Sequence, residues 1–336
     1  MRKMLVATVG LALITLFANV HRAGAQELHW KAVATSRPTP QFGLWTWLAD
    51  ELQKRTNGRV KVEVVSLPEL GMTGFELVRV TRAGLVDISD VIPSYVAGDV
   101  PAIEAIDLPG LFKDLDTSVK AHEGFLPVMK KYEDKMGGIV LGGYLWPAQM
   151  IFSRKPIRGP EDLQGLKVRV YGTAQTEFAK ALGMVPVSIP FAEVYTALER
   201  GTVDAGFTGT YPGFALKWYE VTKYMVDINH GPVQGLLIVS KRSWDKISPD
   251  LRATLTKLGE EFSQRGWEIG RRTTAEGIEK NKEKGMEVIR ATPALAAAAK
   301  DVVMKTVIPS WIQRAGPDGK AIFNQYIAPY SGFTLP

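Results

Sequence analysis

Apolar and polar positions alternate most regularly in residues 165–207. Short β-branched runs predict strands at 167–171, 185–189 and 202–207, because glycine or proline interrupts the pattern around each of them. Two amphipathic stretches between these runs predict helices. The predicted helices are 173–182, with Thr173 as its N-cap, and a helix after Pro190 with Phe191, Val194, Tyr195 and Leu198 on one face. Short strands joined by helices are typical of a parallel α/β sheet.

The same order of elements occurs earlier in the chain. Its predicted strands are 28–34, 59–65 and 85–89, and its predicted helices are 42–55 and 75–82. Both units end on similar residues, Gly84-Leu85-Val86-Asp87 in the first and Gly201-Thr202-Val203-Asp204 in the second. The repeat predicts an α/β protein with two similar lobes and a central cleft that closes on a small solute.

The remaining pattern suggests how the chain passes between the lobes. A buried strand at 138–144 leads to a crossing near Phe152, and residues 236–240 cross back. A long helical pattern follows from Pro249 to about Lys284, and residues 291–336 form a helix-rich tail. The predicted first lobe is 26–148 plus 236–270. The predicted second lobe is 149–235 plus 271–336, including the tail.

The N-terminus has the features of a secretion signal, predicted as residues 1–25. Arg2-Lys3 precedes an apolar run from Met4 to Val20, and Ala23-Gly24-Ala25 supplies a small-residue cleavage site. An uncleaved membrane anchor is the alternative, since the run is close to the shortest length that spans a bilayer. With no cysteine for disulfides or lipid attachment, the chain fits export to a bacterial periplasm through a cleaved signal peptide.

Net charge gives no indication of a nucleic-acid partner. The formal charge is +6, and removal of residues 1–25 leaves 38 basic against 35 acidic residues. No basic run is interleaved with aromatic residues. The four histidines are scattered, and no phosphate-binding loop, nucleophile elbow or metal-ligand spacing occurs. The sequence therefore indicates no metal, no cofactor and no enzyme, and it favours structural roles for Asp87 and Asp204.

Arg169 is a charge within the apolar run Val168–Val170. An arginine on an edge strand, with its charged end in water, is one interpretation. The other places Arg169 at the carboxyl end of a parallel strand, where open α/β sheets bind ligands and a guanidinium matches a carboxylate.

Several segments together resemble the DctP-type solute-binding subunits of tripartite ATP-independent periplasmic (TRAP) transporters. They are Asn57–Arg59, Gly84–Asp87, Leu108–Phe112, Leu163–Val170, Phe191–Asp204 and Trp218–Val221. The similarity covers nearly the whole chain after residue 25. It implies a fold like that of type II periplasmic binding proteins, with a long helix spanning both lobes. It also implies capture of a small organic acid and its delivery to membrane subunits.

The resemblance also implies a binding site. Arg169 corresponds to the arginine that pairs with the ligand carboxylate, and Phe191 to a residue that packs on the ligand. Gln149 stands where many members have a second arginine, and Thr208 where the family has asparagine. Other aromatic residues expected to shape the pocket, each of which has core packing as its alternative, are Tyr95, Trp146, Phe207 and Tyr211.

Loss of the second arginine changes the ligand that we expect. A second carboxylate would have no charge partner, so a monocarboxylate such as an aromatic or 2-oxo acid is favoured over a C4-dicarboxylate. A C4-dicarboxylate binder remains one alternative. A periplasmic sensor that serves a membrane receptor and a periplasmic enzyme that uses the same cleft are the others.

Overall fold

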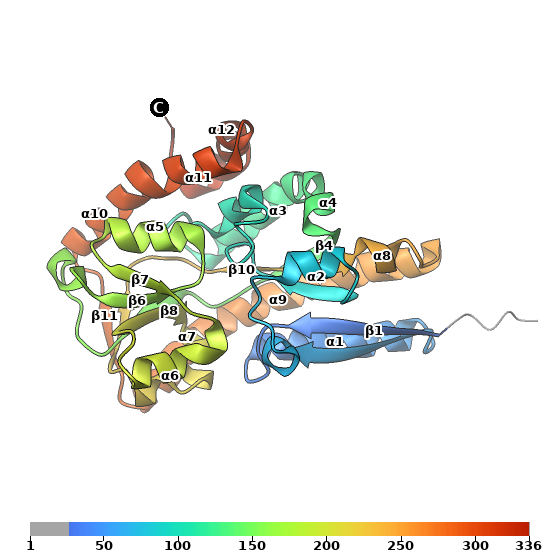
Figure 1. Cartoon of the computed structure of the whole chain (residues 1–336), viewed down its shortest axis with the longest axis horizontal. Helices are drawn as coiled ribbons and strands as arrows, with labels where there is room; N and C mark the ends of the chain where they lie inside the picture. Colours follow the sequence, from blue (N-terminus) through green and yellow to red (C-terminus); the bar gives the residue numbers. More distant parts are fainter. Residues whose placement is uncertain (1–26, 336) are drawn as a thin grey trace, which may run out of the picture.

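The computed structural model describes residues 27–335 and contains two α/β lobes, each built on its own sheet (Figure 1). The secretion signal predicted for residues 1–25 lies outside the described residues. The sheet of the first lobe has the strand order β2-β1-β3-β10-β4. Its strands are β1 (Leu28–Ala34), β2 (Val60–Ser66), β3 (Ile88–Val91), β4 (Gly138–Leu145) and β10 (Gln234–Ser240).

The sheet of the second lobe has the order β11-β9-β5-β8-β6-β7. Its strands are β5 (Gln149–Ser153), β6 (Lys167–Val170), β7 (Val185–Ser188), β8 (Ala205–Gly209), β9 (Tyr224–Asp227) and β11 (Glu287–Arg290). The predicted sheets were parallel, but both are mixed. All strands of the first sheet except β10, and all strands of the second sheet except β5, run in one direction. Strands β10 and β5 run antiparallel to their neighbours because each enters directly from the other lobe.

Helices cover both sheets, and shorter turns connect them. The α-helices are α1 (Pro40–Arg55), α2 (Leu77–Arg82), α3 (Leu115–Lys131), α4 (Glu133–Met136), α5 (Thr173–Ala181), α6 (Val194–Glu199), α7 (Thr210–Ala215), α8 (Lys241–Trp244), α9 (Pro249–Glu283), α10 (Pro293–Val302), α11 (Ile308–Ala315), α12 (Gly319–Ile322) and α13 (Ala328–Ser331). The 3₁₀ turns are η1 (Leu67–Leu70), η2 (Pro101–Asp107), η3 (Pro160–Leu163), η4 (Phe191–Glu193) and η5 (Trp218–Glu220), and the π turns are η6 (Val303–Val307) and η7 (Phe323–Ile327).

Two details of the second unit differ from the sequence prediction. Gly172, rather than Thr173, is the N-cap of α5, so Thr173 is already the first helical residue. The helix expected after Pro190 divides into η4 and α6. The short strand β11 was not predicted, because its four residues adjoin a tail whose pattern is mainly helical.

The two aspartates that end the repeated units have equivalent structural roles. In the first lobe, the Lys31 amide donates to Asp87 Oδ2 at 2.8 Å, and in the second the Lys167 amide donates to Asp204 Oδ2 at 3.2 Å. The Asp87 and Asp204 amides in turn donate to the carbonyls of Lys31 and Lys167 at 3.0 and 2.8 Å. Each carboxylate thus joins a connecting turn to the neighbouring strand, as expected for a structural residue.

Helix α9 spans both lobes (Figure 1) and packs on β4 of the first and on α7 of the second. It has 35 residues and approaches each lobe at a glycine. A Cβ at Gly259 would lie 2.3 Å from the Leu141 carbonyl oxygen, and a Cβ at Gly277 would lie 2.3 Å from the Tyr211 amide nitrogen. Any side chain at these positions would therefore push the helix away from the lobe.

The C-terminal tail contacts both lobes. Helix α10 packs on α5 of the second lobe, whereas α11 packs on η2 and α13 on α3 of the first. The Trp311 indole donates to the Pro101 carbonyl at 2.9 Å, and Arg314 pairs with Glu104 at 2.8 Å and with Glu177 of α5 at 2.5 Å. The lobe boundaries given above stay a prediction.

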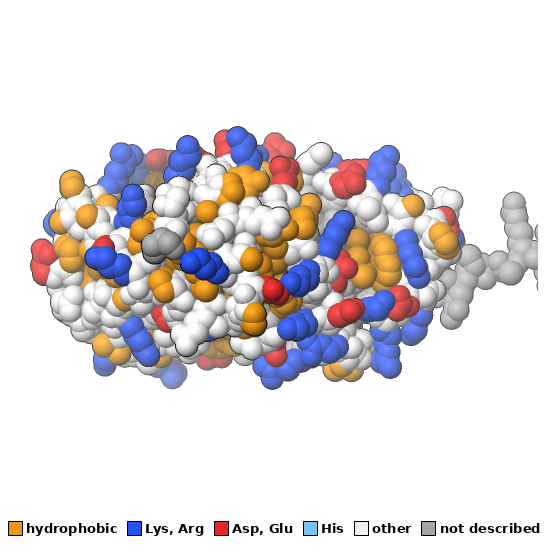
Figure 2. All heavy atoms as spheres, turned by 90° about the horizontal axis from the view of Figure 1, so that it is seen from above, with side chains coloured by type: hydrophobic (Ala, Val, Ile, Leu, Met, Phe, Trp, Pro, Cys, Tyr) orange, Lys and Arg blue, Asp and Glu red, His pale blue; other side chains and the backbone are white. Residues whose placement is uncertain are grey.

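The surface over this tail carries charges of both signs. Figure 2 shows lysine and arginine side chains interspersed with acidic ones and with apolar patches. None of the helices between residues 27 and 335 combines the length and hydrophobicity that crossing a membrane requires.

Candidate ligand-binding cleft

A narrow cavity of about 30 Å³ lies between the lobes. Its walls come from both sheets and from the crossing segments. The lining residues are Thr35, Ile92, Tyr95, Trp146, Gln149, Arg169, Tyr171, Phe191, Thr208, Gly209, Pro212 and Val233. The rings of Tyr95 from the first lobe and Tyr171 from the second are 5.8 Å apart, so the two lobes are in contact across the cleft.

Arg169 is the only charged residue among those that line the cavity. It lies near the carboxyl end of β6, which pairs with β7 on one side and β8 on the other, so the edge-strand interpretation is wrong. Its side chain is 1% exposed. Nε donates to the Ile189 carbonyl at 3.0 Å, and Nη1 donates to the Phe207 carbonyl at 2.8 Å.

These bonds leave one nitrogen of Arg169 without a partner. Nη2 is buried and makes no hydrogen bond to any residue between 27 and 335. The guanidinium carbon lies 4.9 Å from the centre of the Tyr171 ring and 5.9 Å from that of Phe191. Two main-chain carbonyls and two rings therefore fix the guanidinium, while Nη2 remains available to an anion in the cavity.

Two tyrosines complete the surroundings of this arginine. Burial raises the pKa of Tyr95, and the charge of Arg169 acts in the opposite direction. Burial also raises the pKa of Tyr171 well above its usual value, with the charge of Asp107 adding to the effect. Both hydroxyls therefore stay protonated at neutral pH and can act as hydrogen-bond donors.

Gln149 and Thr208 reach the cavity from neighbouring antiparallel strands. Gln149 begins β5 and pairs with Gly209, and Met150 pairs with Thr208. The side-chain Nε2 of Gln149 donates to the Pro147 carbonyl at 2.9 Å, and its Oε1 accepts from the Tyr171 hydroxyl at 3.3 Å. Both side chains are buried and uncharged. The cavity wall therefore has the neutral polar groups of Gln149 and Thr208, and it has no second arginine at the position of Gln149.

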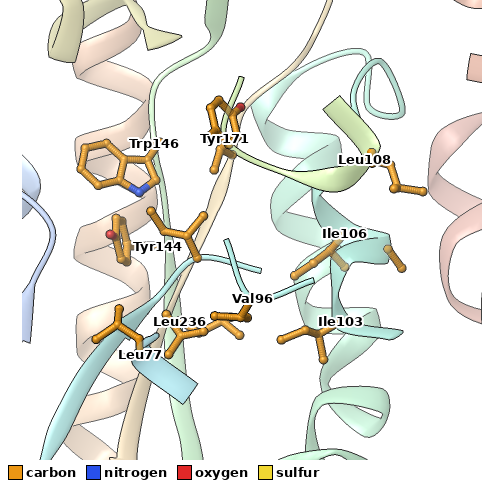
Figure 3. Close-up of a cluster of buried hydrophobic side chains, with 14 of the residues drawn as sticks. Leu77, Val96, Ile103, Ile106, Leu108, Tyr144, Trp146, Tyr171 and Leu236 are labelled. Carbon is orange, nitrogen blue, oxygen red and sulfur yellow. The ribbon is translucent and has the colours of Figure 1, made fainter. Parts of the chain in front are cut away.

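Aromatic side chains form much of the remaining wall. Trp146 lies on the segment that crosses from β4 to β5, and Figure 3 shows it above Tyr144, with Tyr171 beside it. Phe191 begins η4, which follows the end of β7 after Ile189 and Pro190. Together with Tyr95, Trp146 and Phe191 occupy the positions in the cavity wall that the sequence predicts for them.

The structure does not bring Phe207 and Tyr211 to the cavity wall. Side chains alternate along β8, so Thr208 faces the cavity while the Phe207 ring lies on the opposite side against Phe178 and His230. Only the Phe207 carbonyl contributes, through its bond to Arg169. Tyr211 lies on α7, where its ring packs on Phe214 at 5.9 Å.

Sequence reasoning missed several lining residues. They are Thr35, Ile92, Tyr171, Gly209, Pro212 and Val233. The repeat contains a signal for two of them. Val33 pairs with Ser89 in the first sheet as Arg169 pairs with Gly206 in the second, so Thr35 and Tyr171 occupy equivalent positions just beyond their strands. Both belong to the strand ends at which α/β sheets bind ligands.

Two buried carboxylates lie behind the first-lobe wall. Asp90 is 1% exposed and accepts from the Thr35 amide at 2.9 Å, the Thr35 hydroxyl at 2.6 Å and the Tyr144 hydroxyl at 2.7 Å. Asp107 accepts from the Gln234 amide at 2.7 Å and from Ser94. Burial raises the pKa of Asp90 to about 6 and that of Asp107 to about 7, against the bonds that favour ionisation.

The sequence is similar to those of known solute-binding proteins. Residues 32–313 match the family described as bacterial extracellular solute-binding protein, family 7 (DctP). The chain is 28% identical over 268 residues to the 2,3-diketo-L-gulonate-binding periplasmic protein YiaO of Escherichia coli, covering 77% of this chain and 81% of that protein. It is 28% identical over 321 residues to the C4-dicarboxylate-binding periplasmic protein DctP of Rhodobacter capsulatus, covering 94% and 96%.

The fold also matches solved structures over most of the chain. DctP7, a Bordetella pertussis extracytoplasmic solute receptor binding pyroglutamic acid, matches with a TM-score of 0.84 and 26% identity, covering 89% of this chain and 99% of that one. These are solute-binding components of transport systems rather than enzymes. The chain therefore belongs to the DctP family of extracellular solute-binding proteins, the binding subunits of TRAP transporters.

Proposed function

We propose that this protein captures a small organic acid anion in the periplasm and delivers it to the membrane subunits of a TRAP transporter. The observation that carries the proposal is the buried guanidinium of Arg169 in the interlobe cavity, with Nη2 unpartnered. A carboxylate at this nitrogen would satisfy the donor and neutralise the charge. In a site removed from water, such a charge-assisted bond is strong.

The ligand that fits this site best is a monocarboxylate. Arg169 has no second cation beside it in the cavity wall, and Gln149 and Thr208 are neutral. The flat faces of Trp146 and Phe191 suit a planar body such as an aromatic or 2-oxo acid. The pyroglutamate that DctP7 binds has one carboxylate, and the C4-dicarboxylate that the Rhodobacter protein binds has two, so relatives of both kinds exist.

Membership of the family, rather than the cavity, supports delivery to membrane subunits. The predicted export signal in residues 1–25 agrees with capture outside the cytoplasmic membrane. A sensor would bind the same anion with the same residues, so only an uptake measurement distinguishes the two roles.

The test begins with a thermal-shift screen of the purified protein against pyroglutamate, pyruvate, benzoate and succinate, because a ligand of the folded state raises Tm. Calorimetric titration then gives Kd for each acid that raises Tm. Uptake of that acid, labelled, is measured in cells with and without the gene for this chain. Absence of binding to any carboxylate refutes capture. Tight binding without loss of uptake in the deleted strain refutes delivery to a transporter.

A further inference from the structure

The interlobe cavity has opposite electrostatic character on its two sides. The second lobe contributes the cation Arg169 directly to the wall. The first lobe contributes Thr35, Ile92 and Tyr95, none of which is charged. Directly behind this neutral wall lie the carboxylates of Asp90 and Asp107, so a ligand that bridges the lobes meets a positive and a negative environment at its two ends.

Asp90 determines what Thr35 can offer to a ligand. The Thr35 hydroxyl and amide both donate to Asp90 Oδ2, at 2.6 and 2.9 Å, and the Tyr144 hydroxyl donates to Oδ1 at 2.7 Å. A hydroxyl has a single hydrogen, so the Thr35 oxygen retains only its lone pairs for any other partner. Towards the cavity, Thr35 is therefore a hydrogen-bond acceptor.

Asp107 strengthens the same asymmetry. Ser94, which donates to Asp107, lies in the loop between the lining residues Ile92 and Tyr95, and Gln234 follows the lining residue Val233. The charges of both Asp90 and Asp107 act on Tyr95, with a sign opposite to that of Arg169. Neither carboxylate has an ion-pair partner within residues 27–335, so hydrogen-bond donors alone offset the negative potential that they exert on the cavity wall.

From this arrangement, and on the basis of the proposed function, we infer that the site takes a monocarboxylate whose distal polar group is a neutral or cationic hydrogen-bond donor, and that Asp90 disfavours a second carboxylate. The carboxylate of such a ligand pairs with Arg169. Its N–H or O–H group faces the lone pairs of Thr35, with Asp90 behind them. A dicarboxylate in the same orientation places its second negative charge towards Asp90 and beside an acceptor.

Matched ligand pairs isolate the distal group. Succinate is compared with succinamate, and glutarate with glutaramate, because each pair has one length and differs only in a carboxylate against a neutral amide. Titrations at pH 8 keep both buried acids ionised, since their pKa values are about 6 and 7. We expect the amide of each pair to bind at least about tenfold more tightly than the diacid, which corresponds to 1.4 kcal/mol.

The variant Asp90→Asn and a matched control test which residue is responsible. Asp87→Asn removes a carboxylate at the opposite end of β3, where it bonds to Lys31 rather than facing the cavity. Asp90→Asn should reduce the preference for the amide at least threefold, whereas Asp87→Asn should preserve it. Thr35→Val, which removes the acceptor, should weaken binding of the amides more than that of pyruvate, which has no N–H group.

The outcomes separate this inference from the proposed function. A wild-type protein that binds a diacid as tightly as its amide refutes the inference, even when Asp90→Asn does not fold. An unchanged preference in folded Asp90→Asn refutes the role of Asp90. Binding of neither acids nor amides, in these pairs and in the screen above, refutes the proposed function instead. Carboxylate binding that depends on Arg169 but is indifferent to the distal group overturns only the inference.

Discussion

Removal of the Arg169 guanidinium should weaken both ligand binding and the fold. In Arg169→Ala, the carbonyls of Ile189 and Phe207 lose their donor, and a buried carbonyl without a partner costs about 1–3 kcal/mol. The variant also lacks the buried Nη2, which has no partner in the wild-type protein. Its removal stabilises the fold by about as much as one unpartnered carbonyl destabilises it. The net expectation is a loss of about 1–3 kcal/mol in the free energy of unfolding, seen as a Tm lower by several degrees.

The effect on binding should be much larger than the effect on stability. Truncation of one partner of a desolvated charge pair costs about 3–5 kcal/mol, so the affinity for a carboxylate should fall by about 10²- to 10³-fold or more. Arg169→Lys should recover only part of this, because an ammonium cannot bond to the Ile189 and Phe207 carbonyls and also present a parallel pair of N–H groups to a carboxylate.

Calorimetric titration and thermal melts on the same preparations separate the two effects. Asp204→Asn is the control, since a neutral acceptor there weakens a hydrogen bond at the other end of β6, away from the cavity. This control should lower Tm without changing Kd. A folded Arg169→Ala protein with wild-type affinity would refute the role of Arg169 in binding. An unchanged Tm would refute its role in joining β6 to the neighbouring chain segments.

Three further predictions concern stability, specificity and pH. Asp87→Asn should lower Tm more than Asp204→Asn, because Asp87 also accepts from Ser243 while Asp204 makes a single side-chain bond; melts of both variants check this. Gln149→Arg should improve binding of succinate relative to pyroglutamate by adding a second cation to the wall; competition titrations decide it, and an unchanged ratio means that the new side chain does not face the ligand. Burial raises the pKa of Asp107 to about 7, above its value in the unfolded chain, so its contribution to stability is present at low pH and is lost as pH rises from about 4 through 7. Asp107→Asn removes this dependence, so Tm of the variant minus that of wild type should increase between pH 5 and pH 8; a constant difference would contradict the shifted pKa.

Elements with strong local signals were predictable from the sequence. The predicted helix from Pro249 to about Lys284 is confirmed as α9, which ends at Glu283. Pro249 lies in its first turn, and Gly285 follows its end with φ of 88°. The strand over residues 28–34 is also confirmed, because its alternation and the loop after it are local features.

Features set by distant contacts were not predictable. The four residues of β11 have no pattern of their own and become a strand only by pairing with β9. The antiparallel direction of β5 and β10 depends on the path of the chain between lobes, which the sequence pattern of either strand does not encode. Phe207 was expected among the aromatic residues that shape the pocket, but alternation along β8 places its side chain on the side opposite to that of Thr208.

The reasoning that singled out Arg169, a charged residue within a strand, also applies to Asp90. Each is a single charge within a short buried strand segment, Val168–Val170 for the arginine and Ile88–Val91 for the aspartate. The predicted strand ended at Ser89 and so did not include the aspartate, whose burial was missed. A charge inside a strand predicts either a ligand or a set of internal partners, and Asp90 has the second.

The repeated architecture explains why a ligand would have one orientation in this cleft. Register places Val33 of the first lobe where the second has Arg169, and Asp90 where the second has Phe207. The two sheets therefore present equivalent strand ends with opposite charges nearby. The acid of the first lobe accepts three hydrogen bonds from protein donors, while the base of the second retains Nη2 without a partner. We therefore expect the anionic end of the ligand at the second lobe, and the first lobe can complete the closed site only by accepting hydrogen bonds from the other end.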